Sequence, residues 1–161
     1  TLQTTHKEAA MTDFNNVYAQ QLRVGDTLPE FELPITARLV VSTALASQDF
    51  QDVHHDKDAA IAKGTPDIFM NILTTNGFVG RYLTDWAGPG SRIKKIQFNL
   101  GAPNFPGDTM IMSGEVIELS EDGEQQLAHV TFKGKNGMGN HVSGVAVVQL
   151  AHPAGRGGNA S

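Results

Sequence analysis

The sequence contains no cysteine among its 161 residues. A chain without cysteine has no disulfide framework, no thiolate metal ligand and no cysteine nucleophile, and it suits a reducing compartment such as the cytoplasm. Basic residues are also few, with 12 Lys and Arg against 17 Asp and Glu, and they form no long run that could follow a phosphate backbone. We therefore expect a cytoplasmic protein without a nucleic-acid partner, in which any metal ion would need histidine and carboxylate ligands.

Long apolar runs are absent as well. No stretch approaches the roughly 20 residues that cross a bilayer, and the N-terminus has no charged segment followed by an apolar one. We expect no membrane partner and no export signal. The length fits a single domain, which we place at residues 21–151, between a polar tail at residues 1–20 and a Gly-rich tail at residues 152–161, both expected to be mobile.

The first half of the body reads as strand, loop and helices. The β-branched residues of segment 37–46 predict a strand. Asp56 predicts the N-cap of a short helix that Gly64 ends. The sequence TPD at residues 65–67 predicts the start of a long helix. Because this helix carries apolar residues on most of its sides, we expect other structure to enclose it.

The second half reads as four strands, expected at residues 92–101, 108–119, 125–135 and 140–150. The turns between them are short, and KNGMGN is a natural hairpin connection because Asn and Gly tolerate positive φ. Consecutive strands with short turns favour an antiparallel sheet. One long apolar helix beside such a sheet predicts an α+β architecture in which the sheet wraps around the helix, although other α+β sandwiches fit the same pattern.

The segment SQDFQDVHHD, residues 47–56, carries three aspartates and two histidines. Asp49 and His54 lie five residues apart in an expected loop, which can turn both side chains toward one point. A carboxylate and an imidazole that share a water molecule can hold it, take one of its protons and return a proton to carbon. The alternative is a charged surface loop in which the aspartates cap turns and helices, and spacing alone favours that alternative.

A metal site would use His54, His55 and one aspartate. Adjacent residues of an extended segment point to opposite faces, and no third imidazole stands nearby in the sequence, so this hypothesis ranks last. His129 and His141 fall in expected strands, and the remaining histidines fall in the tails. We expect structural or exposed roles for these rather than catalysis.

Several segments in order resemble the MaoC-like family of hotdog (R)-specific enoyl-CoA hydratases. That family carries a segment of the form S-G-D-x-N-P-x-H-x-D followed by an alanine, a glycine and a helix. The residues that match are Ser47, Asp49, His54, Asp56, Ala60 and Gly64. FNLGAPNFPGDTMIMSGEV and RVGDTLPEFELP resemble further family segments. The segments 41–74 and 81–89 resemble the small subunits of the branch that acts on steroid side chains in bacterial cholesterol degradation.

The chain also departs from the family pattern. Gln48, Gln51 and Asp52 stand where the broad family has Gly, Asn and Pro, and Met70 with Asn71 stands where it usually has His-Gly. Both proposed catalytic positions are retained. The departures indicate a specialised substrate or mode of pairing, and they leave the oxyanion donor open.

The resemblance implies a single hotdog fold and hydration of a steroid enoyl-CoA. Asp49 and His54 would be the catalytic residues, and the backbone amide of Asn71 would bind the thioester oxygen of the substrate. No metal or nucleotide cofactor is expected, because coenzyme A arrives as part of the substrate.

The resemblance also implies a partner, a larger MaoC-like subunit in a heterodimer or heterotetramer, with a downstream aldolase reached through that subunit. Two alternatives remain: a non-catalytic scaffold subunit that shapes the acyl pocket, and a hotdog acyl-CoA thioesterase. Retention of Asp49 and His54 speaks against the scaffold. Their spacing and the helix glycine favour hydration over thioester cleavage.

Overall fold

The computed structural model describes residues 16–151, which form one antiparallel sheet and a group of helices. The five strands are β1 (Thr27–Pro34), β2 (Arg92–Leu100), β3 (Thr109–Asp122), β4 (Gln125–Asn136) and β5 (Gly139–Gln149). The helices are α1 (Ala37–Ala46), α2 (Lys57–Ala62) and α3 (Ile72–Ala87), with short 3-10 turns η1 (Ala19–Gln21) and η2 (Asp52–His54).

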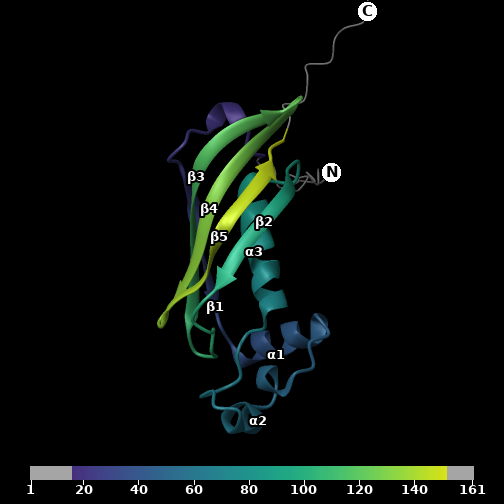
Figure 1. The fold of residues 1–161 in the computed structure, drawn as a ribbon, viewed down its shortest axis with the longest axis vertical. Helices are drawn as coiled ribbons and strands as arrows, with labels where there is room; N and C mark the ends of the chain where they lie inside the picture. The colour runs from purple at the N-terminus through teal and green to yellow at the C-terminus, as the bar shows by residue number, and fades with distance from the viewer. Residues whose placement is uncertain (1–15, 152–161) are drawn as a thin grey trace, which may run out of the picture.

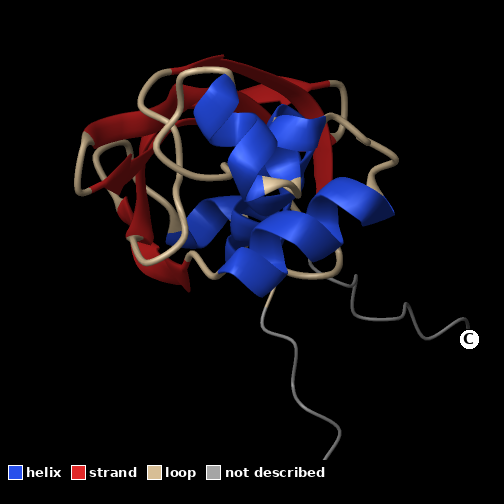
Figure 2. Cartoon of the chain, turned by 90° about the horizontal axis from the view of Figure 1, so that it is seen from below, coloured by secondary structure: helices blue, strands red, loops and turns tan. Residues whose placement is uncertain are grey.

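The sheet curves around α3, as Figure 1 shows, and Figure 2 shows the helices gathered on one side of it. The strand order is β1-β3-β4-β5-β2, so β1 and β2 are the two edges. Alternate residues of β4, including Val130 and Phe132, are buried in the same core as Val79 and Leu83 of α3. The predicted α+β architecture, an antiparallel sheet wrapped around a central helix, is confirmed.

The four predicted strands lie close to the observed β2, β3, β4 and β5. The KNGMGN segment forms the β4–β5 hairpin, in which Gly139 has a φ of 127°. Strand β1 was not predicted, and it pairs with β3. The order along the sheet also differs from the order along the chain, because β2 pairs with β5 and not with β3.

The strand predicted at residues 37–46 is wrong, because this segment is helix α1. The side chain of Thr36 caps the helix by accepting a hydrogen bond of 3.0 Å from the Leu39 N–H. Val40 and Ala44, four residues apart, are fully buried, which is the period of a helix face and not of a strand. Helix cap and burial therefore override the weak strand preference of the β-branched residues.

The long helix begins at Ile72 and not at residue 65, so its predicted start is also wrong. Segment 65–71 is irregular, and its apolar residues Ile68 and Met70 are buried as parts of a loop. Ile72 and Leu73, in the first turn of α3, are 52% and 50% exposed. The expectation of a helix enclosed on most sides is therefore wrong for this turn, which presents apolar side chains at the surface.

The other local predictions can be compared directly. The carboxylate of Asp56 accepts a hydrogen bond of 3.0 Å from the Ala59 N–H and caps α2, and Gly64 has a φ of 93° after the helix, as predicted.

The Val17 N–H donates to the Ala87 carbonyl at 3.1 Å, so the packed body includes residues that were assigned to the N-terminal tail. The tail segments 1–15 and 152–161 lie outside the described residues. None of the helices in the described part is long and apolar enough to cross a membrane.

Candidate active site

The end of helix α1 fixes the position of Asp49. The Asp49 N–H donates to the Ala44 carbonyl at 2.9 Å and the Gln48 N–H donates to the Leu45 carbonyl at 3.0 Å, the two bonds of a Schellman motif. This motif requires a residue in the left-handed backbone conformation after the helix, and Gln48 adopts that conformation with a φ of 57°. The structure thus explains why a glycine suits this position in the resembled family. Asp49 follows at the first residue beyond the turn.

His54 lies on η2 and faces Asp49 across the site. Its Nδ1 is 2.7 Å from the Phe69 carbonyl oxygen. A carbonyl only accepts, so Nδ1 carries a hydrogen and donates it. The other ring nitrogen, Nε2, lies 3.3 Å from Oδ2 of Asp49, and the two side chains are 8% and 17% exposed. The predicted meeting of these two side chains is therefore present in the structure.

Asn71 binds the carboxylate from the N-terminus of α3. Its Nδ2 donates to Oδ2 of Asp49 at 3.0 Å and to Oγ of Ser47 at 2.9 Å. Its Oδ1 accepts from the Thr74 N–H at 2.9 Å and so caps the helix. One side chain therefore fixes the first turn of α3 and the orientation of the carboxylate together.

The pKa of Asp49 lies below its ordinary value. The largest cause is the hydrogen bond from the Asn71 side chain, with smaller lowering contributions from the Gln51 N–H and the charge of His54, while partial burial acts in the opposite direction. Asp49 is thus a carboxylate at neutral pH, able only to accept hydrogen bonds.

The geometry leaves room for one shared hydrogen between Asp49 and His54. With Nδ1 protonated toward Phe69, neutral His54 presents a lone pair on Nε2 to a carboxylate oxygen. Two acceptors at this distance repel each other unless a hydrogen lies between or beside them. An imidazolium N–H supplies it, and so does a water molecule that donates to both groups. The pair is suited to hold water and to exchange one proton with it.

The other charged residues of segment 47–56 have structural contacts. Asp52 forms an ion pair of 2.9 Å with Lys63, and Asp56 caps α2. Nε2 of His55 donates to the Phe50 carbonyl at 3.1 Å. The surface-loop interpretation therefore describes these three residues well.

Sequence reasoning missed two acceptors that hold the site together, Phe69 and Ser47. The Phe69 carbonyl fixes the tautomer of His54, and the backbone of Phe69 is itself held, since its N–H donates to the Val53 carbonyl at 3.1 Å. A backbone carbonyl leaves no mark in a sequence. The Ser47 hydroxyl lay inside the quoted motif, but its partner Asn71 is 24 residues away.

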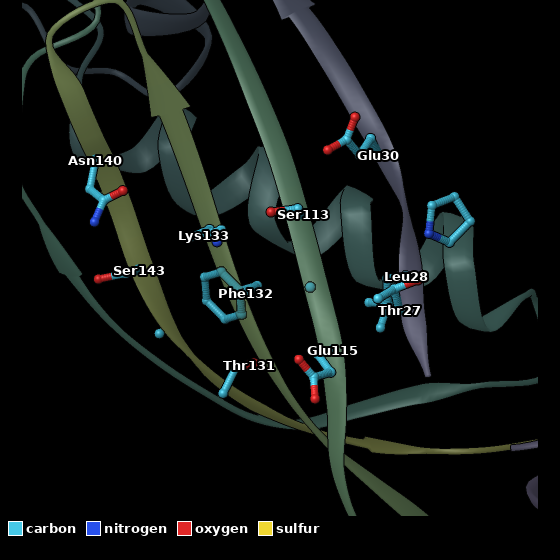
Figure 3. A pocket seen from close by; sticks show the side chains of 13 residues that line it. Thr27, Leu28, Glu30, Ser113, Glu115, Thr131, Phe132, Lys133, Asn140 and Ser143 are labelled. Carbon is cyan, nitrogen blue, oxygen red and sulfur yellow. The ribbon is translucent and has the colours of Figure 1, made fainter. Parts of the chain in front are cut away.

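Several hollows in the described structure are lined by residues other than Asp49 and His54, among them the following three. A groove of about 340 Å³ runs between α1 and α3 and reaches Ser47. A hollow of about 690 Å³ lies beside the start of α3 and β2. A cavity of about 730 Å³ lies over β1, β3, β4 and β5, with Glu30, Ser113, Glu115 and Lys133 among its lining residues. In Figure 3, α3 runs behind these strands. Asp49 and His54 are therefore catalytic candidates because of their contact with each other and not because they line a large cavity.

Within residues 16–151, no group of three or more His, Asp or Glu side chains is arranged to hold a metal ion. His129 lies in β4 with Nε2 2.9 Å from the Ser120 hydroxyl, and His141 lies in β5 with Nε2 2.8 Å from the Thr75 hydroxyl. Both strand placements agree with the sequence prediction.

Comparison with known proteins identifies relatives over most of the chain. The MaoC like domain family matches residues 20–136. The 3-oxo-4,17-pregnadiene-20-carboxyl-CoA hydratase beta subunit of Mycobacterium tuberculosis is 51% identical over 128 residues, 80% of this chain and 95% of that protein. A chain in a crystal structure of the ChsH1-ChsH2 complex from Mycobacterium tuberculosis is 48% identical with a TM-score of 0.74, covering 80% of this chain and 98% of that one. An (R)-hydratase from A. caviae is 28% identical with a TM-score of 0.71, covering 82% of this chain and 99% of that one.

Proposed function

This chain belongs to the MaoC-like domain family, and we propose that it is an enoyl-CoA hydratase subunit. In this proposal it adds water across the 2,3 double bond of a steroid side-chain enoyl-CoA and works with a second MaoC-like hotdog subunit. The observation that carries the proposal is the 51% identity to a steroid carboxyl-CoA hydratase beta subunit in a chain that brings Asp49 and His54 within 3.3 Å of each other.

The chemistry follows from the tautomer of His54. Water that donates a hydrogen bond to Asp49 gives one proton to Nε2 of His54 while its oxygen adds to the β-carbon of the enoyl thioester. The imidazolium formed is stabilised by the adjacent carboxylate and by the Phe69 carbonyl. It then returns the proton to the α-carbon on the same face. One water molecule is consumed, and each step is reversible.

Negative charge develops on the thioester oxygen during attack at the β-carbon. Backbone N–H groups at the start of a helix favour such charge, because they lack partners within the helix and lie at the positive end of its dipole. We propose the backbone N–H of Asn71 as a donor, as the sequence predicts. Its position at the N-cap of α3, next to Asp49, supports this assignment.

The proposed reaction needs only acid, base and hydrogen-bond donors. We therefore propose that it proceeds without a metal or nucleotide cofactor and that coenzyme A enters as part of the substrate. A cytoplasmic location belongs to the same proposal, supported by a cysteine-free sequence that suits a reducing compartment.

A partner subunit has a suitable surface at the β2 edge. Strand β2 pairs with β5 on one side only, so one row of its backbone groups is open to another strand. Next to this edge lie Ile72 and Val145, which are 52% and 42% exposed. Together with Ile96 and Phe98 they line the hollow of about 690 Å³ described above. We define these four residues as the β2 patch and propose that the larger MaoC-like subunit binds there, with the downstream aldolase reached through that subunit.

Co-expression with candidate large subunits tests the function. The purified assembly is given a steroid enoyl-CoA and a short-chain enoyl-CoA, and the products are identified by mass spectrometry. We expect a product heavier than the substrate by one water from the steroid thioester and much slower turnover of the short chain. If a confirmed assembly hydrated neither substrate, the proposed function would be wrong.

The same assay separates the two alternatives. Release of free thiol without a hydrated thioester would identify a thioesterase. A scaffold role would be supported if the assembly hydrated its substrate at the normal rate after substitution of Asp49.

A further inference from the structure

His141 is a buried histidine on β5 that contacts the first turn of α3. It is 4% exposed. Its Nδ1 lies 2.7 Å from the Ala102 carbonyl oxygen and therefore carries a hydrogen, because a carbonyl only accepts. In neutral His141 the other nitrogen, Nε2, is then an acceptor. The Thr75 hydroxyl, fully buried and 2.8 Å away, donates to it.

Thr75 also contacts the residue that orients the catalytic carboxylate. Its N–H donates to the Asn71 carbonyl at 3.2 Å, and its hydroxyl oxygen lies 3.3 Å from the same carbonyl. The hydroxyl has a single hydrogen, which neutral His141 receives. If His141 were protonated, Nε2 would donate to the Thr75 hydroxyl, and the hydroxyl hydrogen would turn toward Asn71.

These contacts form one buried chain from His141 through Thr75 and Asn71 to Asp49. His141, Thr75 and Asn71 are 4%, 0% and 2% exposed, so water does not compete with the hydrogen bonds between them. Asn71 ends the chain with its bond of 3.0 Å to Oδ2 of Asp49. A change at either buried partner therefore reaches the carboxylate through the N-cap of α3.

We propose that Thr75 and His141 are positioning residues for Asp49. The neutral imidazole holds the Thr75 side chain against β5, and the Thr75 N–H holds the Asn71 carbonyl. The first turn of α3, with the amide that orients the carboxylate, is thereby anchored to the sheet. This inference rests on the proposed hydratase function. Burial lowers the pKa of His141, an effect that the hydrogen bond to Ala102 opposes, and this shift keeps the imidazole in the acceptor form near pH 7. Both hydrogen-bond partners of His141, the Thr75 hydroxyl and the Ala102 carbonyl, are uncharged.

The neighbouring residue Thr74 provides a matched control. Its hydroxyl is buried in the same helix turn but has no hydrogen-bond partner. Thr75→Val and Thr74→Val each exchange a hydroxyl for a methyl group of similar size, and Thr75→Ser keeps the hydroxyl. A purely structural role would make the effect of Thr75→Val follow the loss of folding stability alone.

The experiment measures kcat and KM of the assembled complex for these three variants and for one double variant. We expect Thr75→Val to lower kcat about tenfold at nearly unchanged KM, because a misoriented carboxylate slows the chemical step more than binding. Thr75→Ser is expected to restore the wild-type kcat and Thr74→Val to retain it. The double variant Thr75→Val with His141→Gln is expected to lose no more than Thr75→Val alone, because the two residues act through one bond.

Equal kcat values for Thr75→Val and Thr74→Val in an active complex would overturn the inference and leave the proposed function intact. An inactive wild-type complex would instead contradict the proposed function. The coupling is then read by NMR from the side-chain amide of Asn71. If the chain exists, Thr75→Val shifts this signal and Thr75→Ser, which keeps the hydroxyl, leaves it in place; an unchanged signal in Thr75→Val overturns the inference.

Discussion

At the residue scale, Asn71 connects the fold to the proposed chemistry. Its Oδ1 caps α3 while both hydrogens of its Nδ2 are used, one on Asp49 and one on Ser47. The residue was singled out in the sequence for its backbone amide, a role that stays a prediction. Its side-chain role comes from the structure, because Asn71 and Asp49 are 22 residues apart.

Asn71→Asp tests this side-chain role. The new carboxylate still caps α3 but places a like charge beside Asp49, which raises the pKa of the carboxylate pair. We expect the acid limb of the pH–rate profile to move to higher pH and kcat at pH 7 to fall by about 100-fold. An unshifted profile in a folded variant would show that Asn71 does not orient the carboxylate.

The sequence predicted part of the candidate site. The spacing of Asp49 and His54 in a loop allowed their meeting but favoured a surface loop, and the family resemblance made the meeting an expectation. The structure places Nε2 of His54 3.3 Å from Asp49. The Phe69 carbonyl could not be predicted, since any residue type supplies a carbonyl. Its position depends on a loop that was expected to be helix.

At the element scale, the Schellman motif at the end of α1 determines where Asp49 lies. This motif holds Gln48 in the left-handed region at a φ of 57°. A residue with a Cβ is strained there by roughly 1–2 kcal/mol, whereas glycine is not. The chain therefore keeps a strained backbone directly before a proposed catalytic residue.

Gln48→Gly is expected to raise the free energy of unfolding by roughly 0.5–1 kcal/mol, since relief of strain exceeds the entropy that glycine loses on folding. Hydratase activity should stay within about twofold. Urea denaturation measures the stability. Ser42→Gly, at an exposed position inside the same helix, is the control and should destabilise. Destabilisation by Gln48→Gly would contradict the strain.

Sequence patterns predicted the elements of the sheet better than those of the helical half. Alternation of apolar residues and short Gly-containing turns mark β3, β4 and β5 directly. In α1 the β-branched residues led to a wrong strand prediction. The Thr36 cap and the burial of residues four apart make this segment a helix. The start of α3 was misplaced because Pro66 suits a helix start and a loop equally well.

At the scale of the whole molecule, burial of neutral His141 makes folding stability depend on pH. Its folded-state pKa is lowered from the ordinary value of 6.5, so below that pH the unfolded chain binds a proton that the folded chain does not. Stability from this residue is thus complete above about pH 6.5. It falls as the pH drops below that value and levels off below the lower pKa of the folded state.

His141→Gln removes this contribution. We expect its unfolding free energy to change less than that of the wild type when the pH is lowered from 7 to 5, as measured by urea denaturation at each pH. His129→Gln controls for the loss of an imidazole from the sheet. The same pH slope in His141→Gln and the wild type would rule out a neutral buried His141.

Assembly is also a property of the whole molecule, and the β2 patch makes it testable. Ile72→Asp places a charge in the patch, while an acidic residue in the first turn of α3 suits the helix dipole, so folding is preserved. We expect the Kd for the partner subunit to rise at least about tenfold. Ile61→Asp on α2, where Ile61 is 50% exposed, is the matched control. Equal Kd values for the two variants would place the partner elsewhere.

The central claim is that Asp49 and His54 together add water to an enoyl thioester. The most direct measurement is the hydration rate of the assembled complex carrying Asp49→Asn or His54→Ala, with folding and assembly verified for each. We predict that each substitution lowers kcat by about 100-fold or more, since each removes one of two groups that act on the same water. Near wild-type hydration by either variant would contradict the claim.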